Sequence, residues 1–365
     1  MRIIYFSKNY TPHDYRFLSS LAKTEHEVFY LKLEASQRPT EDRPVPSNIQ
    51  QILWAGGQRE FHWRDVPKYV LSLRDIIKKI KPDMIHAGPI QTCAFIALLS
   101  GFRPVLTMSW AYDLVQEADR NSWMKRITYY VLRESAYFIS DAQVTRDKAV
   151  VFGVAPEKTV IFPWGINLEQ FKPSTKKRRK AITLFCSRTW ESLYGVDVLV
   201  KAFVRVAASN PHVDLILLGE GSQGARIRQI LMNGGVLDRV HFGGQISQSD
   251  LPRWYYMADI YISPSHVDGS SVSLMEALAC GLPCLVSDIP GNKEWITEDE
   301  NGWLFRDSDA DDLAEKILHA IKNRRSFKKM GESARKTAEQ KADWKKNFGK
   351  LLEAYEKVSS LRGGR

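Results

Sequence analysis

The chain has 365 residues, and this length favours two domains, each with a core large enough to fold without disulfides. Its formal net charge of +10 would suit nucleic acid, anionic lipid or phosphorylated ligands alike, but no DNA- or RNA-binding motif is present, so we do not expect nucleic acid as a partner. No apolar run is long enough for a membrane span or a signal peptide, so we expect a cytoplasmic protein that can contact the anionic inner face of the membrane only peripherally.

The first half of the sequence alternates short β-rich runs with segments of helical period. The expected strands are residues 2–6, 28–33, 84–87, 105–108 and 137–140, and the expected helices are 66–80, 92–102 and 123–134. Such alternation predicts a parallel sheet with helices on both faces.

A basic run of five Lys and Arg residues, 176–180, separates this half from a second alternating pattern and is interpreted as a solvated linker. The second set of expected strands is 181–186, 213–218, 240–242, 260–263 and 284–287, with helices at 196–208, 226–232 and 272–279. The sequence therefore predicts an α/β protein with two doubly wound, Rossmann-like domains, 1–168 and 181–343, joined by a linker at 169–180 and facing each other across a cleft. The amphipathic segment 344–360 is expected to pack back on the first domain.

The four cysteines, Cys93, Cys186, Cys280 and Cys284, all lie in apolar runs. The last two have three residues between them, a spacing that fits neither a zinc knuckle nor a thioredoxin motif. We therefore expect buried thiols in a reducing compartment, and no metal site.

The segment with the strongest functional signal runs from residue 263 to residue 283. It leaves a strand, passes through a Gly/Ser loop and begins a helix at Ser270 or Ser271. Free amides at a helix start suit a pyrophosphate. Asp268 and Glu276 are eight positions apart, so both carboxylates can face one crevice and accept hydrogen bonds from sugar hydroxyls. A solvated Asp and a surface Glu would explain the same letters equally well.

Two further strand ends carry polar groups of the same kind. Arg188 follows residues 184–187 and could hold a leaving diphosphate, and a loop with Gly291 and Glu294 follows the strand at 284–287. Carboxyl ends of parallel strands form the ligand crevice in open α/β sheets. We therefore expect these groups to converge.

The order of these pieces resembles glycosyltransferase family 4, the retaining GT-B enzymes also called glycosyl transferases group 1, over nearly the whole chain. The acidic pair with seven residues between its members matches Asp268 and Glu276, and the Ala-x-Ala-Cys-Gly-x-Pro that follows matches residues 277–283. The loop 291–294 and the segment 163–167 also resemble family motifs. The resemblance implies transfer of a sugar from a UDP-, GDP- or ADP-linked donor to a glycan, a lipid-linked or a small-molecule acceptor, without a further cofactor, in polysaccharide or glycoconjugate biosynthesis.

The same resemblance implies roles for single residues. Glu276 would hold the donor ribose, Arg188 the diphosphate, and Asp268 the sugar, with Arg188 and Asp268 as catalytic candidates. Phosphates would meet the backbone amides of the helix start, which belong to Gly269, Ser270, Ser271 and Val272, and Glu294 would also face the donor.

The sequence departs from the family in three places. Asp268 stands where the family usually has Glu, one methylene longer. The phosphate-binding lysine is replaced near Tyr194, and neither Lys201 nor Lys293 is at its position. In the first domain residues 11–14 replace the usual Gly-Gly loop. Weakened phosphate binding, another donor or lost activity would each fit these changes.

In the first domain, Asp113 ends a strand segment, 108–113, that resembles the family's donor-sugar loop, and it is the third catalytic candidate, although a helix cap would explain it equally well. Trp110, His13 and His86 are further candidates for the cleft, with a core histidine as the alternative for His86.

Two patterns are interpreted as imitations of other sites. The Gly-rich segment 219–224 follows a strand, but no acidic residue ends the next strand, so Gly219 is expected near the nucleotide in a loop that is no nicotinamide site. Asp307 and Asp309 imitate a metal-binding Asp-x-Asp, but they precede a helix and are expected to cap it.

Two rival functions remain open at this point. The changes at residues 268 and 194 would suit a nucleotide-sugar-binding or scaffold subunit that has lost catalysis. A sugar-nucleotide epimerase could use the same architecture. The donor base, the sugar, the acceptor and the oligomeric state have no readable code in the sequence.

Overall fold

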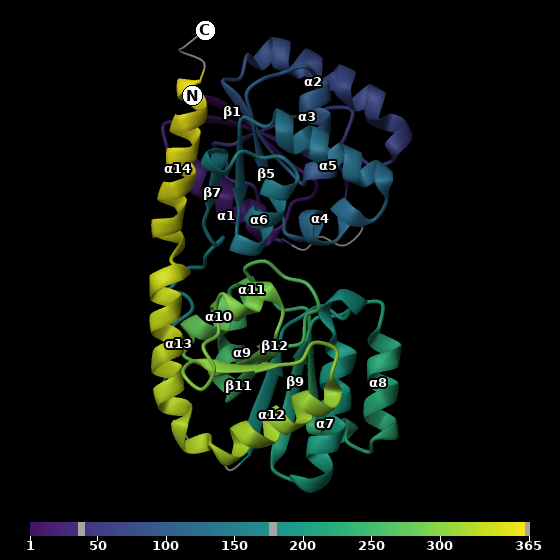
Figure 1. Cartoon of the computed structure of the whole chain (residues 1–365), viewed down its shortest axis with the longest axis vertical. Coiled ribbons are helices and arrows are strands. Elements are labelled where there is room, and N and C mark those ends of the chain that lie inside the picture. Colours follow the sequence, from purple (N-terminus) through teal and green to yellow (C-terminus); the bar gives the residue numbers. More distant parts are fainter. Residues whose placement is uncertain (36–40, 175–180, 362–365) are drawn as a thin grey trace. The chain divides into compact units, whose positions relative to one another are not determined.

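The structure is a computed structural model that describes residues 1–35, 41–174 and 181–361 (Figure 1). It divides into two compact units: unit 1 comprises Met1–Phe162 and the chain from Lys346 onward, and unit 2 comprises Pro163–Lys345. The change from one unit to the other thus comes six residues before the expected domain end at 168. Half of the expected linker, 175–180, lies outside the described residues.

Unit 1 is built on one parallel seven-stranded sheet in the order β3-β2-β1-β4-β5-β6-β7. Its strands are β1 (Arg2–Ser7), β2 (Glu27–Lys32), β3 (Gln50–Gln51), β4 (Met84–Gly88), β5 (Val105–Met108), β6 (Tyr137–Ser140) and β7 (Thr159–Ile161). The five expected strands are confirmed within a residue or two, because each is a buried run of β-branched, aromatic and aliphatic side chains.

Helices cover both faces of this sheet. They are α1 (Pro12–Leu21), α2 (Val66–Ile80), α3 (Phe95–Leu99), α4 (Tyr112–Val115), α5 (Ser122–Glu134) and α6 (Gln143–Val151). The expected helix 92–102 is corrected: a π-helical segment, Ile90–Ala94, precedes α3, which ends at Leu99, and Gly101 then adopts a left-handed φ of 83°. Asp14 is part of a capping box with Thr11 at the start of α1.

Unit 2 repeats the plan with a parallel six-stranded sheet in the order β10-β9-β8-β11-β12-β13. The strands are β8 (Ile182–Cys186), β9 (Val213–Leu218), β10 (Val240–Gly244), β11 (Ile260–Ser263), β12 (Cys284–Ser287) and β13 (Gly302–Phe305). The helices are α7 (Val196–Ser209), α8 (Gly224–Asn233), α9 (Leu251–Met257), α10 (Val272–Ala279), α11 (Pro290–Lys293), α12 (Ala310–Lys322) and α13 (Phe327–Lys341). The expected strands and helices of this half are confirmed.

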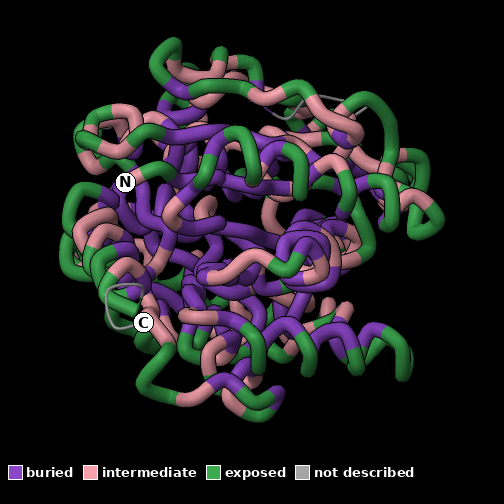
Figure 2. The backbone as a smooth tube through the Cα atoms, turned by 90° about the horizontal axis from the view of Figure 1, so that it is seen from above, coloured by how far each residue is buried: buried purple, intermediate pink, exposed green. Residues whose placement is uncertain are grey.

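Each face of the second sheet has its own hydrophobic core. One core joins the sheet to α7, α8 and α12, and the other joins it to α9, α10 and α13. Figure 2 colours the whole chain by burial, with buried residues in purple and exposed residues in green on the outside. The two-sided covering explains why the strands are continuous apolar runs instead of alternating patterns.

The last helix, α14 (Trp344–Ser360), begins in unit 2 and belongs to unit 1 from Lys346 onward. Its Tyr355 hydroxyl lies 2.7 Å from Nδ1 of His86 on β4, and both side chains are fully buried. The ring of His86 also contacts Tyr5 edge-on, with the centroids 5.0 Å apart. His86 is therefore a core histidine that holds α14 on the sheet. This is the alternative that the sequence analysis gave to a place in the cleft.

Burial lowers the pKa of His86 to about 3. In the unfolded chain the imidazole takes up a proton near its ordinary pKa of about 6.5, whereas in the folded chain it stays neutral until much lower pH. The contribution of this group to stability is therefore complete above about pH 6.5 and is lost as the pH falls.

Replacement of His86 by Phe should remove this dependence. Relative to the His86→Phe variant, the free energy of unfolding of unit 1 in the unsubstituted chain should fall by about 1.4 kcal/mol for each pH unit below about 6.5. Hydrogen exchange of the β4 and α14 amides, compared between the two proteins at each pH, measures the difference. Parallel pH profiles for the two proteins would contradict the account.

Candidate functional site

Strands β8 and β11 are neighbours in the sheet of unit 2, although α7, β9, α8, β10 and α9 lie between them in the chain. The strand order reverses between them, which makes this pair the topological switch point, where open α/β sheets bind ligands at the carboxyl ends of the strands. Arg188 follows β8 and the loop 264–271 follows β11. The sequence thus places its strongest motif and its candidate cation at the same edge of the sheet.

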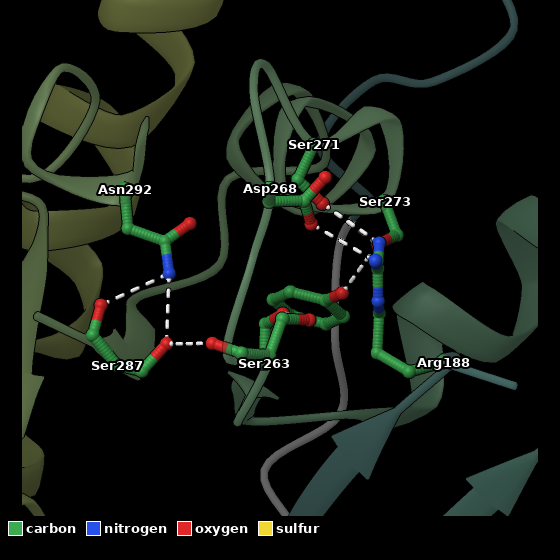
Figure 3. Close-up of polar contacts among 9 residues, drawn as sticks. Arg188, Ser263, Asp268, Ser271, Ser273, Ser287 and Asn292 are labelled. Atoms are coloured by element: carbon green, nitrogen blue, oxygen red, sulfur yellow. Dashed lines mark hydrogen bonds and ion pairs between the residues drawn. The ribbon is translucent and has the colours of Figure 1, made fainter. Parts of the chain in front are cut away.

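The guanidinium of Arg188 contacts several polar side chains at this edge (Figure 3). Its Nη2 lies 2.9 Å from Oδ2 of Asp268, and its Nη1 donates to the hydroxyls of Ser271 at 3.0 Å and Ser273 at 3.1 Å. The Tyr194 ring lies under it, 4.2 Å from Cζ to the ring centroid. The Arg188 and Asp268 side chains are 12% and 18% exposed. An ion pair so shielded from water is held more tightly than a surface pair.

The charge on Arg188 is secure despite this burial. Desolvation acts to lower its pKa, but the Asp268 carboxylate and the neighbouring tyrosines more than offset it and raise the pKa above its already high ordinary value. The guanidinium is therefore a fixed cation at any pH at which the protein is folded.

Helix α10 begins at the same point. Ser271 is its N-cap residue, but its hydroxyl makes no capping bond and accepts from Arg188 instead. The first-turn amides of a helix carry partial positive charge and need acceptors from outside the helix. The start of α10 and the guanidinium together form a site suited to an anion such as a diphosphate.

The second carboxylate of the motif, Glu276, lies one turn further along α10 and is 2% exposed. The Tyr255 hydroxyl donates to its Oε2 at 2.8 Å and also lies 3.1 Å from the carbonyl oxygen of Ser273. Burial and the Glu276 charge raise the pKa of Tyr255, so it stays a donor. The Ser273 hydroxyl accepts in turn from Tyr261 at 2.7 Å. Arg188, Asp268, Ser271 and Glu276 thus share one network through Ser273.

The loop that carries Asp268 is pressed against the next strand end. A Cβ on Gly291, which opens α11 with Pro290, would lie 2.4 Å from the carbonyl oxygen of Asp268 and 2.5 Å from that of Gly269. Only glycine permits this approach. Asn292 donates through Nδ2 to the carbonyl oxygen of Ser287 at 2.9 Å and to its hydroxyl at 3.1 Å, and so fixes α11 to the end of β12 (Figure 3).

Other candidates also lie around Arg188. Gly219 has a φ of 83°, and a Cβ there would lie 2.9 Å from the carbonyl oxygen of Arg188, so the Gly-rich loop packs on the backbone of the arginine. Ser270 and Val272 flank the N-cap of α10, and Glu294 is the residue that closes α11. The two lysines that could replace the missing one are engaged elsewhere: Lys201 pairs with Asp197 at 2.9 Å and Lys293 lies 3.5 Å from Asp288.

Of the two aspartates in the Asp-x-Asp segment, Asp309 caps the helix as predicted, and Asp307 contacts a histidine instead. Asp309 is the N-cap of α12 and accepts from the amides of Asp311 and Asp312. The Asp307 carboxylate lies 2.6 Å from Nδ1 of His266, in the loop that leads to Asp268. Within 1–35, 41–174 and 181–361, no group of three or more His, Cys, Asp or Glu side chains is arranged to hold a metal ion.

In unit 1, Asp113 is fully buried after β5. Its carboxylate accepts from the Ser109 hydroxyl at 2.6 Å and from the amides of Trp110 and Ile90 at 3.0 Å each. Burial raises its pKa to about 6, against these hydrogen bonds. Trp110, only half-buried, lies beside His13, with the ring centroids 5.2 Å apart and the ring planes tilted by 49°. Asp113 therefore fixes the turn that presents Trp110, and its part in catalysis stays a prediction.

Sequence reasoning missed the side chains that hold the site together. Tyr255 is on α9, a helix that the periodicity did not predict, and nothing in the sequence links it to a glutamate 21 positions later. Ser273 and Asn292 were within the motifs, but their contacts depend on strand order. Tyr194 carried a weak signal, because it stands near the expected place of a cation.

Comparisons with known proteins find similarity to glycosyltransferases in both units. Sequence models match at residues 167–337, described as "Glycosyl transferases group 1", and at residues 2–142, described as "Glycosyl transferase 4-like". A D-inositol 3-phosphate glycosyltransferase of Paenarthrobacter aurescens is 22% identical over 92% of this chain and 90% of its own. A GDP-mannose-dependent phosphatidylinositol monomannoside mannosyltransferase of Corynebacterium glutamicum is 25% identical over 76% of this chain and 77% of its own.

Solved structures show the same fold. Sucrose-phosphate synthase of Thermosynechococcus elongatus superposes with a TM-score of 0.83 at 18% identity, covering 99% of this chain and 100% of that one. The Anabaena protein HepE in complex with UDP-glucose gives 0.77 at 16% identity, over 99% and 100%. The GT-B fold expected from the sequence, with two Rossmann-like parts, is thereby confirmed. A separate search of the described helices found none with the length and apolar character needed to cross a membrane.

Substitution of Gly291 by Ala should displace the loop that carries Asp268, because the new methyl group would overlap two carbonyl oxygens. We expect faster hydrogen exchange in residues 264–273 and little change in the β8 and β11 amides. Gly349→Ala in α14 is the matched control, since a Cβ there meets nothing within 4 Å. Unchanged exchange of the loop in Gly291→Ala would show that the contact does not position it.

Proposed function

Since the chain belongs to the glycosyl transferases group 1 family and is a glycosyltransferase of the GT-B type, we propose that it binds a nucleotide-diphosphate sugar at the edge of unit 2 where β8 and β11 end. There it would transfer the sugar, with retention of anomeric configuration, to a glycan, a lipid-linked or a small-molecule acceptor. The observation that supports this best is the permanent guanidinium of Arg188 beside the uncapped start of α10.

The proposed chemistry depends on charge that develops at the leaving group. As the bond between the sugar and the diphosphate breaks, negative charge grows on the diphosphate oxygens and positive charge on the sugar ring. Arg188 and the first-turn amides of α10 are already oriented, so they stabilise that negative charge without reorganisation in the transition state. Hydrogen-bond donors of the protein that hold the diphosphate more strongly as its charge develops accelerate the chemical step.

The two carboxylates would have different tasks. Glu276, oriented by Tyr255, would accept hydrogen bonds from the donor ribose, because a fixed carboxylate oxygen pairs well with vicinal hydroxyls. Asp268 would contact the donor sugar after releasing Arg188, with which it is paired in this structure. Gly269, Ser270, Ser271, Val272, Gly219 and Glu294 complete the proposed donor-binding set.

We propose that unit 1 binds the acceptor. Trp110 and His13 offer partly exposed aromatic rings after β5 and before α1, and aromatic faces are suited to the apolar side of a sugar ring. Asp113 acts here through the backbone amides that it holds, as a positioning residue. Assembly of a polysaccharide or glycoconjugate is the setting proposed for the reaction.

The direct test is transfer by the purified full-length chain. UDP-, GDP- and ADP-linked sugars are first screened by thermal shift, because a ligand that binds only the folded state raises its stability by mass action. The donor that binds is then incubated with glycan and lipid-linked acceptors, and the anomer formed is read by NMR. Product of the donor's own configuration supports the proposal. If the chain binds the nucleotide but neither transfers the sugar nor hydrolyses the donor, the result would support a binding subunit instead.

Glu276→Gln should lower transfer by about 10- to 100-fold, since it replaces a hydrogen bond to a charged acceptor by one to a neutral amide of the same shape. The melting temperature should change little. Glu339→Gln, whose carboxylate pairs with Arg335 at the surface of α13, is the control and should transfer normally. Near-normal turnover in Glu276→Gln would refute the role of Glu276.

Asp268→Asn should separate binding from transfer. The change removes the carboxylate that neutralises Arg188, so free UDP, which has no sugar to contact residue 268, should bind more tightly, by about tenfold if the pair contributes about 1.4 kcal/mol. Transfer should fall, because the proposed sugar contact is weakened. Calorimetric titration with UDP measures the first effect. Weaker UDP binding by Asp268→Asn would contradict the idea that Asp268 competes with the diphosphate.

A further inference from the structure

One face of unit 1 leaves large apolar side chains exposed. Trp63 precedes α2, Leu71 lies on α2, and Trp123 and Tyr130 lie on α5; their exposed fractions are 39%, 60%, 54% and 37%. Single exposed apolar side chains are common on soluble proteins, but a group of them gathered on one face indicates contact with something else. We call these four residues the aromatic face.

The aromatic face is continuous across three helices that lie side by side in Figure 1. Helix α3 packs against both α2 and α5, and the Phe95 ring at its start bridges them. The centroid of this ring is 6.3 Å from that of Trp63 and 6.0 Å from that of Tyr130. Trp123 and Tyr130 are two turns apart on α5, so they project on the same side, while Met124, Ile127 and Val131 face the core.

Positive charge surrounds these side chains. Helix α5 adds Arg126 between Trp123 and Tyr130, and α2 adds Lys68 one turn before Leu71; both side chains are exposed. From residue 66 to residue 81 there are five Lys and Arg against one acidic residue, Asp75. The Asp65 and Glu134 carboxylates beside this face are paired with Arg59 at 2.9 Å and Arg103 at 2.8 Å. The excess of positive charge is therefore not neutralised within the face.

We propose that the aromatic face docks on the surface of an anionic lipid bilayer. Trp and Tyr rings have an apolar body and a polar edge, and they settle at the level of lipid head groups. Lys and Arg beside them are attracted to anionic lipids within the short range that salt allows. Basic side chains stand between the exposed apolar ones, whereas the core of a protein interface is depleted of charge, so the pattern fits shallow insertion among head groups better than a protein interface.

This docking rests on unit 1 alone and does not depend on the donor site of unit 2. If the acceptor is lipid-linked, as included in the proposed function, the same contact would hold the enzyme at the surface where that acceptor is concentrated. Loss of vesicle binding and loss of nucleotide binding are therefore separate observations, and either proposal can fail without the other.

The test is cosedimentation of the full-length chain with vesicles of phosphatidylcholine alone or of equal parts phosphatidylcholine and phosphatidylglycerol. We expect binding to the anionic vesicles that weakens as salt is added, and little binding to phosphatidylcholine alone. Trp123→Ser combined with Tyr130→Ser should lower the partition coefficient at least tenfold, and Lys68→Glu combined with Arg126→Glu should abolish binding. All four side chains are exposed, so melting temperatures should stay unchanged.

The control is Met232→Ser on α8 of unit 2, which removes an apolar side chain that is 56% exposed outside the aromatic face. It should bind vesicles as the unsubstituted chain does. The proposal is overturned if anionic vesicles fail to bind the chain at low salt, or if the control loses as much binding as Trp123→Ser/Tyr130→Ser. Full binding by Trp123→Ser/Tyr130→Ser would also overturn it, because a purely electrostatic attraction needs no aromatic side chains.

Discussion

The buried guanidinium of Arg188 is the constraint on which the rest of the site depends. A cation that is only 12% exposed must be matched by negative or polar partners, and Asp268, Ser271 and Ser273 supply them. Two of these partners belong to the first turn of α10 or its cap, so the arginine ties the end of β8 to the start of a helix that follows β11. The guanidinium is thereby set in place before any ligand arrives.

That arrangement requires backbone segments to approach each other closely. Gly219 lets the loop after β9 rest on the carbonyl of Arg188, and Gly291 lets α11 rest on the carbonyls of the loop after β11. A side chain at either position would push these loops apart, so both glycines shape the geometry of the site. The network of Tyr255, Tyr261 and Ser273 then fixes Glu276 from the other side. The backbone segments that carry the site are thus supported by several strand ends at once.

Much of this could be predicted from the sequence, for reasons that particular segments make clear. Strands such as β5 and β9 are buried on both faces, so each apolar run in the sequence has the same bounds as the strand. Helices α2 and α10 also have the expected bounds. The short edge strands β3 and β7 have too few residues to show a period. Placement of Arg188 next to α10 followed from the switch-point rule. The ion pair between Asp268 and Arg188 could not be predicted in this way. The sequence shows an aspartate at position 268, but it does not show whether the carboxylate contacts a sugar or pairs with a cation.

The same pairing gives a physical meaning to the departures from the family pattern. A shorter acidic side chain at 268 rests on the arginine, and the Tyr194 ring lies against that guanidinium where a second cation was expected nearby. The diphosphate would therefore meet one strong cation and a helix start, and it would have to displace Asp268 to reach the cation fully. This arrangement suits an enzyme in which donor binding and rearrangement of residue 268 occur together.

The most direct measurement of the central claim is a crystal structure of the chain with UDP bound. The account predicts the diphosphate oxygens within hydrogen-bond distance of the Arg188 guanidinium and of the first-turn amides of α10, with the Asp268 carboxylate moved off the arginine. A diphosphate bound elsewhere on unit 2, with the pair between Arg188 and Asp268 still intact, would contradict it.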